Sequence, residues 1–310
     1  MFQQTIVIKP PYSFQRLLHR LEFHPDPQLR IERESNTLHR AFRVGGQPVL
    51  VSLRFDGSVE EPLLHINTHA ALTPARQAEL LKLIRHSFST DVDLAPLYGH
   101  MAENERLRLL AERFRGLRFL LDSDLFGSMV RTILGQQVNL AFAAALTDRL
   151  LTLAGDVLED EQGNRYLAFP TAEAVARLEI PQLRELQFSQ RKAEYIIDFA
   201  RAVVDGKVDL ERLQSMTDDE VIACLTPLRG IGRWSVECLL MFGMGRPDLL
   251  PAADIGLRNG IQLVYGIDEK LSEAQIRSIG EAWAPYRSYV SLYIWEAVGA
   301  MRRGEWQTDI

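Results

Sequence analysis

The sequence predicts an α+β fold, in which a small domain built on a sheet precedes a larger, mostly helical part. Two observations predict it. Over residues 1–90, short apolar runs alternate with turn signals such as Gly45-Gly46 and Asp56-Gly57, which is typical of paired strands. From residue 103 onward, apolar residues recur at helical spacing almost throughout. We therefore expect an N-terminal α+β domain over residues 1–95 and a helical core over residues 96–310.

Each element is predicted from its own residues, by β-branched and aromatic runs for strands and by the 3.6-residue period for helices. The strands are expected at Thr5–Lys9, Leu29–Arg33, Thr37–Val44, Pro48–Phe55 and Pro62–Ile66, and helices of the first domain at Ser13–Leu21 and Pro74–Phe88. The segment Thr90–Met101 gives a mixed signal. Helices of the core are expected at Glu103–Phe114, Leu125–Leu134, Leu140–Ala154, Thr171–Leu178, Pro181–Leu186, Ser189–Val204, Asp218–Leu225, Trp234–Phe242, Gly256–Val264, Glu273–Trp283 and Ser288–Ala300.

Composition limits the class of protein without deciding it. With 310 residues, 46% of them hydrophobic, the chain can bury a sizeable core. The first residues lack the basic and apolar regions of an export signal, and no segment approaches roughly 18 uninterrupted apolar residues. Two cysteines, Cys224 and Cys238, cannot build a disulfide framework or supply the four thiolates of an iron–sulfur cluster. We expect a cytoplasmic protein with no membrane partner and no required cofactor.

The stretch Leu228-Arg-Gly-Ile-Gly-Arg-Trp-Ser235 is the most informative part of the chain. Gly230 and Gly232 allow positive φ and close backbone approach, so this turn can direct free N–H groups at an anion such as a phosphodiester. Ser235 adds a hydroxyl, and Arg229 and Arg233 add positive charge. The alternative is a tight turn between two helices, with the apolar residue between the glycines plugging the core.

A single carboxylate follows this turn. Asp254 stands after Pro251-Ala-Ala and before a helical run that includes Arg258. One interpretation is a helix N-cap, which Asp fills well. The other uses the same geometry, because a helix N-terminus keeps a carboxylate ionised and able to face a developing cation.

Four motifs in order carry a resemblance to a known family. Besides Leu228–Arg258, they are Ile133-Leu-Gly-Gln-Gln-Val138, then Phe188-Ser-Gln-Arg-Lys-Ala193, and Trp283-Ala-Pro-Tyr-Arg-Ser-Tyr289 followed by Tyr293-Ile-Trp295. In these residues the chain resembles the helix-hairpin-helix (HhH-GPD) superfamily of DNA glycosylases, in the branch typified by bacterial 3-methyladenine DNA glycosylase II. The resemblance implies two helical subdomains in the core, a helix-hairpin-helix unit near residues 220–243, and a TATA-binding-protein-like sheet domain before them.

The implied function is that of a monofunctional glycosylase of base excision repair. It would flip an alkylated base out of double-stranded DNA and hydrolyse the N-glycosidic bond, leaving an abasic site. Asp254 would stabilise the positive sugar of the transition state and orient or deprotonate the attacking water. Alkylation at N3 or N7 makes a purine cationic, so a strong general acid is not required. The preferred lesion stays open among 3-methyladenine, 7-methylguanine, ethenoadenine, hypoxanthine and methylated pyrimidines.

The resemblance also assigns the residues that receive the base. Trp234 and Trp295 would line its pocket, where a cationic base over an indole gains about 0.5–2 kcal/mol. Core packing is the alternative for Trp295, and more so for Phe126, a further aromatic residue of the pocket set. Cys238 stands where the family often has an aromatic pocket wall, which predicts a roomier pocket, unless the thiol only fills core space.

A second departure concerns the wedge, the residue that fills the gap left by a flipped nucleotide. Where the family has a bulky apolar side chain, this sequence places Gln137, which could hydrogen-bond the orphaned base. Alternatively, Gln136 and Gln137 cap or bridge helix ends, and the wedge is Leu140.

Two further expectations concern the hairpin. Family members that also cut the DNA backbone carry a Lys just after the glycines, whose amine attacks the sugar; this chain has Trp234 there. Lys192 lies in a different motif, and its position predicts a residue on a helix surface. No lyase activity is therefore expected. The resemblance implies a structural Na⁺ or K⁺ held by main-chain carbonyls of Thr226, Leu228 and Ile231.

The partner implied is double-stranded DNA with alkylated bases, met by a monomer in the bacterial cytoplasm at the nucleoid. The net charge of −6 is unfavourable for DNA contact unless basic residues gather at the contact face, as arginines around the hairpin do in sequence. Two rival hypotheses remain: a non-catalytic helix-hairpin-helix DNA-binding protein, and a helical bundle whose arginines are simply solvated.

Overall fold

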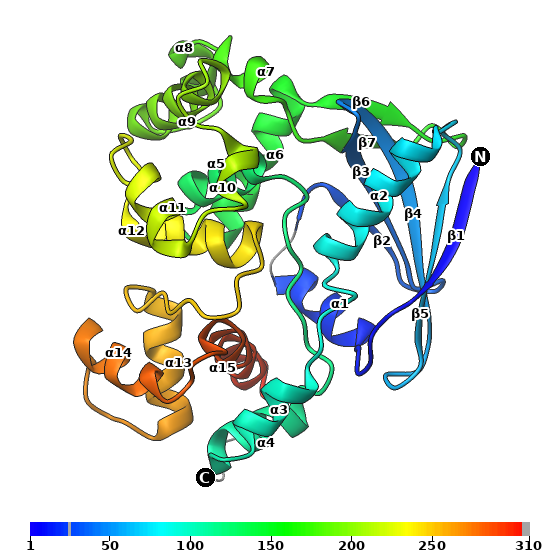
Figure 1. The fold of residues 1–310 in the computed structure, drawn as a ribbon. Helices are drawn as coiled ribbons and strands as arrows, with labels where there is room; N and C mark the ends of the chain where they lie inside the picture. The colour runs from blue at the N-terminus through cyan, green and yellow to red at the C-terminus, as the bar shows by residue number, and fades with distance from the viewer. Residues whose placement is uncertain (24–25, 306–310) are drawn as a thin grey trace.

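The computed structural model describes residues 1–23 and 26–305 and shows a sheet domain beside a larger body of helices (Figure 1). The strands of the main sheet are β1 (Phe2–Val7), β2 (Leu29–Glu32), β3 (Thr37–Val44), β4 (Gln47–Gly57) and β5 (Pro62–Thr68). They lie in the order β1-β5-β4-β3-β2, and each neighbouring pair is antiparallel. The predicted α+β fold is confirmed, while residues 306–310 of the predicted core lie outside the described residues.

One face of the sheet forms the core of the first domain. Along β4, Leu53 and Phe55 are buried while Arg54 between them is exposed, because successive side chains of a strand point to opposite faces. The helices α1 (Phe14–Phe23) and α2 (Pro74–Ser87) lie over the buried face (Figure 1) and contribute apolar residues such as Leu18 and Ile84 to this core. The alternation in the sequence thus predicts which face is covered.

The helices from residue 95 onward form two groups (Figure 1). The upper group holds α5 (Leu125–Gly135), α6 (Leu140–Ala154), α7 (Ala172–Ala176), α8 (Ile180–Glu185), α9 (Gln190–Val204), α10 (Leu210–Leu213), α11 (Asp218–Leu225), α12 (Arg233–Cys238) and the π-helical turn η1 (Leu239–Gly243). The lower group holds α3 (Ala95–Met101), α4 (Glu105–Arg113), α13 (Ile255–Tyr265), α14 (Glu273–Glu281) and α15 (Arg287–Arg302). The chain therefore crosses from the upper to the lower group between residues 243 and 255.

Several predicted elements need correction. The sequence predicts no element between α6 and α7. In the structure this segment forms a β-hairpin of β6 (Asp156–Glu159) and β7 (Arg165–Ala168), which lies against the main sheet (Figure 1). The mixed segment Thr90–Met101 contains the short helix α3, and α10 lies where the sequence predicts no helix. The helix predicted at Trp234–Phe242 is α12 followed by the wider turn η1.

A buried arginine joins the sheet domain to the helices. Arg118, in the connection after α4, donates to main-chain carbonyls of Lys9, Pro11, Ser89 and Val92. Hydrogen bonds that involve a charged group contribute roughly 1.5–3 kcal/mol each. The first domain is therefore fixed in place on the core that holds the candidate site. In the described part of the chain, no helix combines the length and the apolar character needed to cross a bilayer.

Candidate active site

Asp254 is the N-cap of α13, as one interpretation of the sequence has it. Its Oδ1 accepts the main-chain N–H of Leu257 at 2.6 Å and the indole Nε1–H of Trp295 at 3.1 Å. Asp254 is partly exposed. Its neighbours Ala253 and Ile255 are both exposed, Ile255 to 70%. Both donors use the same oxygen, so Oδ2 has no hydrogen-bond donor among the residues that the structure describes. This leaves one carboxylate oxygen oriented by the protein and one available to a ligand.

The connection between η1 and α13, which carries the Asp254 carboxylate, is fixed to the start of α15. Asp248 pairs with the Arg287 guanidinium through both carboxylate oxygens, each at 2.7 Å. The hydroxyl of Ser288 accepts the N–H of Leu249 at 2.9 Å and donates to the carbonyl of Arg246 at 2.7 Å. Because α15 also carries the indole that binds the carboxylate, one helix orients both the connection and its acidic side chain.

Aromatic and small apolar side chains lie beside the carboxylate. The ring of Trp295 stacks on Phe242 of η1, with centroids 6.0 Å apart. Trp234, in the first turn of α12, is partly exposed. Cys238, one turn further on, is buried, and burial raises the pKa of its thiol, an effect to which the charge of Asp254 adds. The structure thus brings Trp295 and a neutral thiol close to the acid.

Phe126 is placed differently from the pocket residues of the sequence prediction. It is buried in α5, stacked on Phe199 with ring centroids 5.8 Å apart, and it meets Phe169 edge to face. These contacts put the ring in the core between α5 and α9, which is the alternative that the sequence left open for it.

The turn between α11 and α12 requires its first glycine. Gly230 has φ +84°, and a Cβ there would stand 2.2 Å from the ring of Tyr195. Ile231 is buried and plugs the core beneath the turn, whereas Gly232 is exposed as the N-cap of α12. The two interpretations of this stretch, an anion-binding turn and a turn that plugs the core, are therefore compatible. Ile231 packs inward, while Gly232 beside it is exposed.

Ser235 does not present its hydroxyl to the outside. The residue is buried, and its Oγ accepts the side-chain Nε2–H of Gln136 at 2.9 Å. The same Gln136 amide donates to the carbonyl of Gly230 at 2.8 Å. The hydroxyl predicted to contact phosphate thus ties the hairpin to the end of α5 instead.

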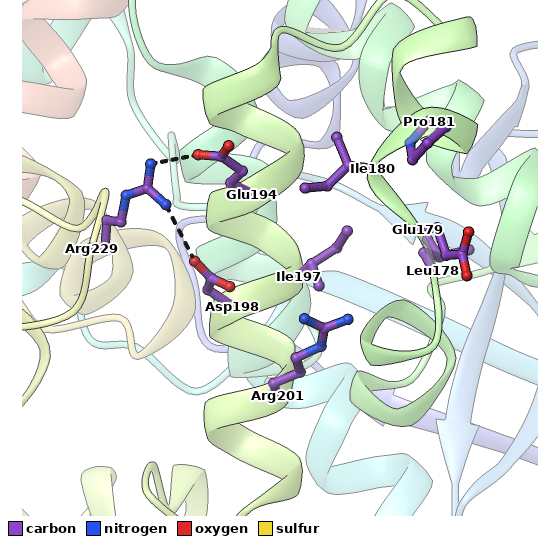
Figure 2. Close-up of a pocket in the computed structure, with 9 residues that line it drawn as sticks. All are labelled: Leu178, Glu179, Ile180, Pro181, Glu194, Ile197, Asp198, Arg201 and Arg229. Atoms are coloured by element: carbon purple, nitrogen blue, oxygen red, sulfur yellow. Dashed lines mark hydrogen bonds and ion pairs between the residues drawn. The ribbon is translucent and has the colours of Figure 1, made fainter.

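The arginines around the hairpin are paired with protein carboxylates. Arg229 reaches across to Glu194 and Asp198 of α9 (Figure 2) and packs over the ring of Tyr195. It lines a hollow of about 420 Å³ between α8, α9 and the hairpin. Arg233 binds Glu237 at 3.0 Å, one turn along α12. Both guanidinium groups remain largely exposed, so each keeps a side toward solvent.

A second hollow, of about 270 Å³, lies against α12 and includes Arg233, Glu237 and Arg277 in its walls. Burial raises the pKa of Glu237, and the two arginines oppose that shift. Asp254 lines neither of the two hollows. On α13, the main-chain N–H of Arg258 donates to the Asp254 carbonyl, and its Nε is buried without a partner in the described residues.

The connection between α5 and α6 presents both wedge candidates. Gln137 is exposed and has φ +56°, and Leu140, the first residue of α6, is 57% exposed. Lys192 corrects the sequence prediction: it is not a surface residue but is 8% exposed, and its ammonium donates to the carbonyls of Ile133, Leu134 and Gln136. Nothing in the sequence pattern separates such a lysine from a solvated one in the first turn of a helix.

The predicted cation ligands are main-chain carbonyls of the hairpin, at Thr226, Leu228 and Ile231. That of Leu228 already accepts the N–H of Ile231 at 3.1 Å, which leaves it a second lone pair. Neutral carbonyl oxygens are the ligands that suit Na⁺ and K⁺, so the donor set fits such an ion. Over the described residues, no three His, Cys, Asp or Glu side chains gather as a metal site; Cys224 is exposed and Cys238 buried.

Comparison with known proteins assigns the chain to a family. Residues 130–285 match the HhH-GPD superfamily base excision DNA repair proteins. The chain is 30% identical to DNA-3-methyladenine glycosylase 2 of Escherichia coli, over 98% of this chain and 99% of that protein. It is 34% identical to YfjP of Bacillus subtilis, provisionally named a DNA-3-methyladenine glycosylase, over 96% of this chain and 100% of that protein.

The fold agrees with these similarities. The solved 3-methyladenine DNA glycosylase from Archaeoglobus fulgidus superposes with a TM-score of 0.81 at 25% identity, covering 96% of this chain and 97% of that one. Sequence and fold thus match along nearly the whole chain, the sheet domain included. The protein belongs to the HhH-GPD superfamily of base excision DNA repair proteins.

Proposed function

We propose that this protein is a monofunctional DNA glycosylase that removes alkylated purines from double-stranded DNA and leaves an abasic site. The observation that carries the proposal is the carboxylate of Asp254, held through Oδ1 by Leu257 and Trp295 while Oδ2 is left for a ligand. Such an arrangement suits electrostatic stabilisation, because the oriented charge needs no rearrangement when the reaction develops positive charge.

The chemistry assigned to the site is hydrolysis of the N-glycosidic bond. When that bond breaks, its electron pair goes to the base, so a cationic alkylated purine leaves as a neutral molecule. Positive charge develops on C1′ and the ring oxygen of the sugar, facing Asp254. Water then adds its oxygen to C1′ and loses a proton, which Asp254 can accept. Because the leaving base is already positive, one carboxylate is sufficient for this class of substrate.

The base must leave the duplex before this chemistry, and we assign its binding to Trp234 and Trp295. A cationic base over an indole face gains about 0.5–2 kcal/mol, which a neutral base does not. Cys238, which is neutral and small, stands on the same face of α12 as Trp234 and near Asp254. This set favours a cationic aromatic base over the neutral, unmodified bases of DNA.

Two arrangements support the absence of lyase chemistry. Trp234 follows the hairpin where a Schiff-base lysine would stand, and the amine of Lys192 is engaged by three main-chain carbonyls. The buried ammonium is therefore not free to attack a sugar.

The decisive experiment is base release from DNA treated with a methylating agent, with the freed bases separated and identified by chromatography. We expect 3-methyladenine and 7-methylguanine to be released and the abasic strand to stay intact until it is treated with alkali. Borohydride should trap no covalent adduct between protein and DNA. Release of no modified base would reject the glycosylase, and a trapped adduct would reject its monofunctional character.

A further inference from the structure

Lys192 occupies a position that its own helix does not favour. Ser189 caps α9, accepting the main-chain N–H of Lys192, so the lysine belongs to the first turn. A positive charge there faces the positive end of the α9 dipole. The side chain is nevertheless almost fully buried, and over the described residues no carboxylate lies within ion-pair distance of it. Contacts outside α9 must therefore account for its placement.

Those contacts lie at the other end of a different helix. The Nζ of Lys192 donates to the carbonyls of Ile133, Leu134 and Gln136 at 2.7, 2.8 and 2.8 Å. The last carbonyls of a helix have no intrahelical donor, and the negative end of the dipole favours a cation there. Three N–H groups thus meet three carbonyls at the C-terminus of α5. Burial lowers the pKa of Lys192 to about 8, so the ammonium form prevails at neutral pH.

The residue that follows α5 is held a second time, through its side chain. Gln136 donates from Nε2 to the carbonyl of Gly230 at 2.8 Å and to the hydroxyl of Ser235 at 2.9 Å. Its backbone is thus bound to α9 and its amide to the hairpin. The far end of the same connection is fixed by Asn139, whose side chain caps α6 by accepting the N–H of Phe142.

Between these fixed points lies the exposed tip. Gln137 has a left-handed backbone, a conformation that non-glycine residues keep only where the surroundings impose it. We propose that Lys192 and Gln136 form a clamp that sets the height and direction of this tip relative to the hairpin, so that Gln137 and Leu140 enter a duplex in register with Asp254. This assignment rests on the proposed glycosylase function, in which the tip fills the space left by the flipped nucleotide.

The clamp acts on duplex opening rather than on bond cleavage, so the test compares two substrates. A methylated purine in single-stranded DNA is already free of its partner and needs little opening, whereas in a duplex it must be flipped. We expect Lys192→Met and Gln136→Leu to lower excision from duplex DNA by about 10- to 100-fold, the size of effect that a misplaced group causes. Excision from the single strand should stay within about twofold, because neither side chain is hydrogen-bonded to Asp254, Trp234 or Trp295.

A matched control and a second readout separate the outcomes. Lys207→Met removes an exposed lysine that pairs with Asp205 just after α9, and it should change neither rate. Fluorescence of 2-aminopurine placed beside an abasic analogue in a duplex reports opening without catalysis. Wild-type protein should raise this signal on binding, and the two clamp variants should raise it much less.

If both clamp variants lose the same factor on duplex and single strand, the residues serve general structure and the clamp is rejected. Unchanged duplex rates reject it as well. Should Lys192→Met fail to fold in thermal melts, Gln136→Leu carries the test, since it leaves the buried ammonium and its three carbonyls intact. Wild-type protein that opens the duplex but frees no base rejects the glycosylase proposal and leaves the clamp to be judged by the fluorescence alone.

Discussion

Replacing Asp254 by Asn removes a charge and almost nothing else. The Asn side chain has the same shape, and its Oδ1 can still accept the N–H groups of Leu257 and Trp295 that hold the carboxylate. Asn is also as good an N-cap as Asp, so α13 keeps its start. We therefore expect unchanged folding and DNA affinity, with loss confined to bond cleavage.

The size of that loss follows from Coulomb's law. A carboxylate about 4 Å from a unit positive charge, at an effective dielectric constant of about 20, contributes about 4 kcal/mol. Each 1.36 kcal/mol of barrier is a factor of ten in rate, so Asp254→Asn should slow excision by about a thousandfold. Asp254→Ala removes the cap as well, and it should cost about 1 kcal/mol of stability in addition.

The assay is single-turnover release of 7-methylguanine from duplex DNA with enzyme in excess, so that product release does not limit the rate. Binding is measured separately, by fluorescence anisotropy on a duplex with an abasic analogue. If the Asn variant keeps more than about a tenth of the wild-type rate, the charge is not the source of catalysis and the role of Asp254 is refuted. If binding is lost together with release, the carboxylate organises the DNA contact surface instead.

Three further changes test other contacts. Trp295→Phe keeps an aromatic face but removes the indole bond to Asp254, so single-turnover release should fall by at least about tenfold at unchanged DNA affinity; an unchanged rate would show that the indole does not orient the acid. Gly230→Ala places a Cβ 2.2 Å from the ring of Tyr195 at φ +84°, where a non-glycine backbone alone costs about 1–2 kcal/mol, so the thermal midpoint should drop by several degrees; an unaltered midpoint contradicts the steric argument. Burial lowers the pKa of His86 below its usual 6.5, so as the pH falls through that value the unfolded chain binds the proton first and stability is lost; His86→Gln should lose less stability between pH 7.5 and 5.5 in thermal melts, and an equal loss in both proteins would count against this reasoning.

The sequence predicts helices with capped ends better than short strands. The helix expected at Gly256–Val264 is α13, and its start is marked by the Asp that caps it. The sequence does not predict the hairpin of β6 and β7, although it predicts the equally short β2: Leu29 and Ile31 of β2 alternate with polar residues, whereas the apolar residues of β6 and β7 are adjacent, so neither strand shows alternation. The turn does carry a signal, an Asp at its start: the side-chain carboxylate of Asp160 accepts two main-chain N–H groups, including that of Asn164.

Contacts between distant segments could not be predicted from the pattern. The indole of Trp295 meets Asp254 from 41 positions away, and no local rule connects them. The sequence predicts a solvated Lys192, because a lysine in the first turn of a helix is usually exposed. Its burial depends on carbonyls at the end of another helix, α5, which the local pattern does not reveal. The ion pairs of Arg229 with α9 are hidden in the same way. Motifs thus identify the chemical groups, while tertiary packing decides which of them are free.

The buried guanidinium of Arg118 has a practical consequence for anyone who wishes to shorten this protein. Its hydrogen-bond acceptors come from both ends of the first ninety-odd residues. A truncated helical fragment would lose these four carbonyls and would expose apolar side chains such as Leu120, which packs against the core of the first domain, so it should aggregate. The first domain and the helical core should therefore be studied together, and a shortened protein should keep the residues that bind Arg118.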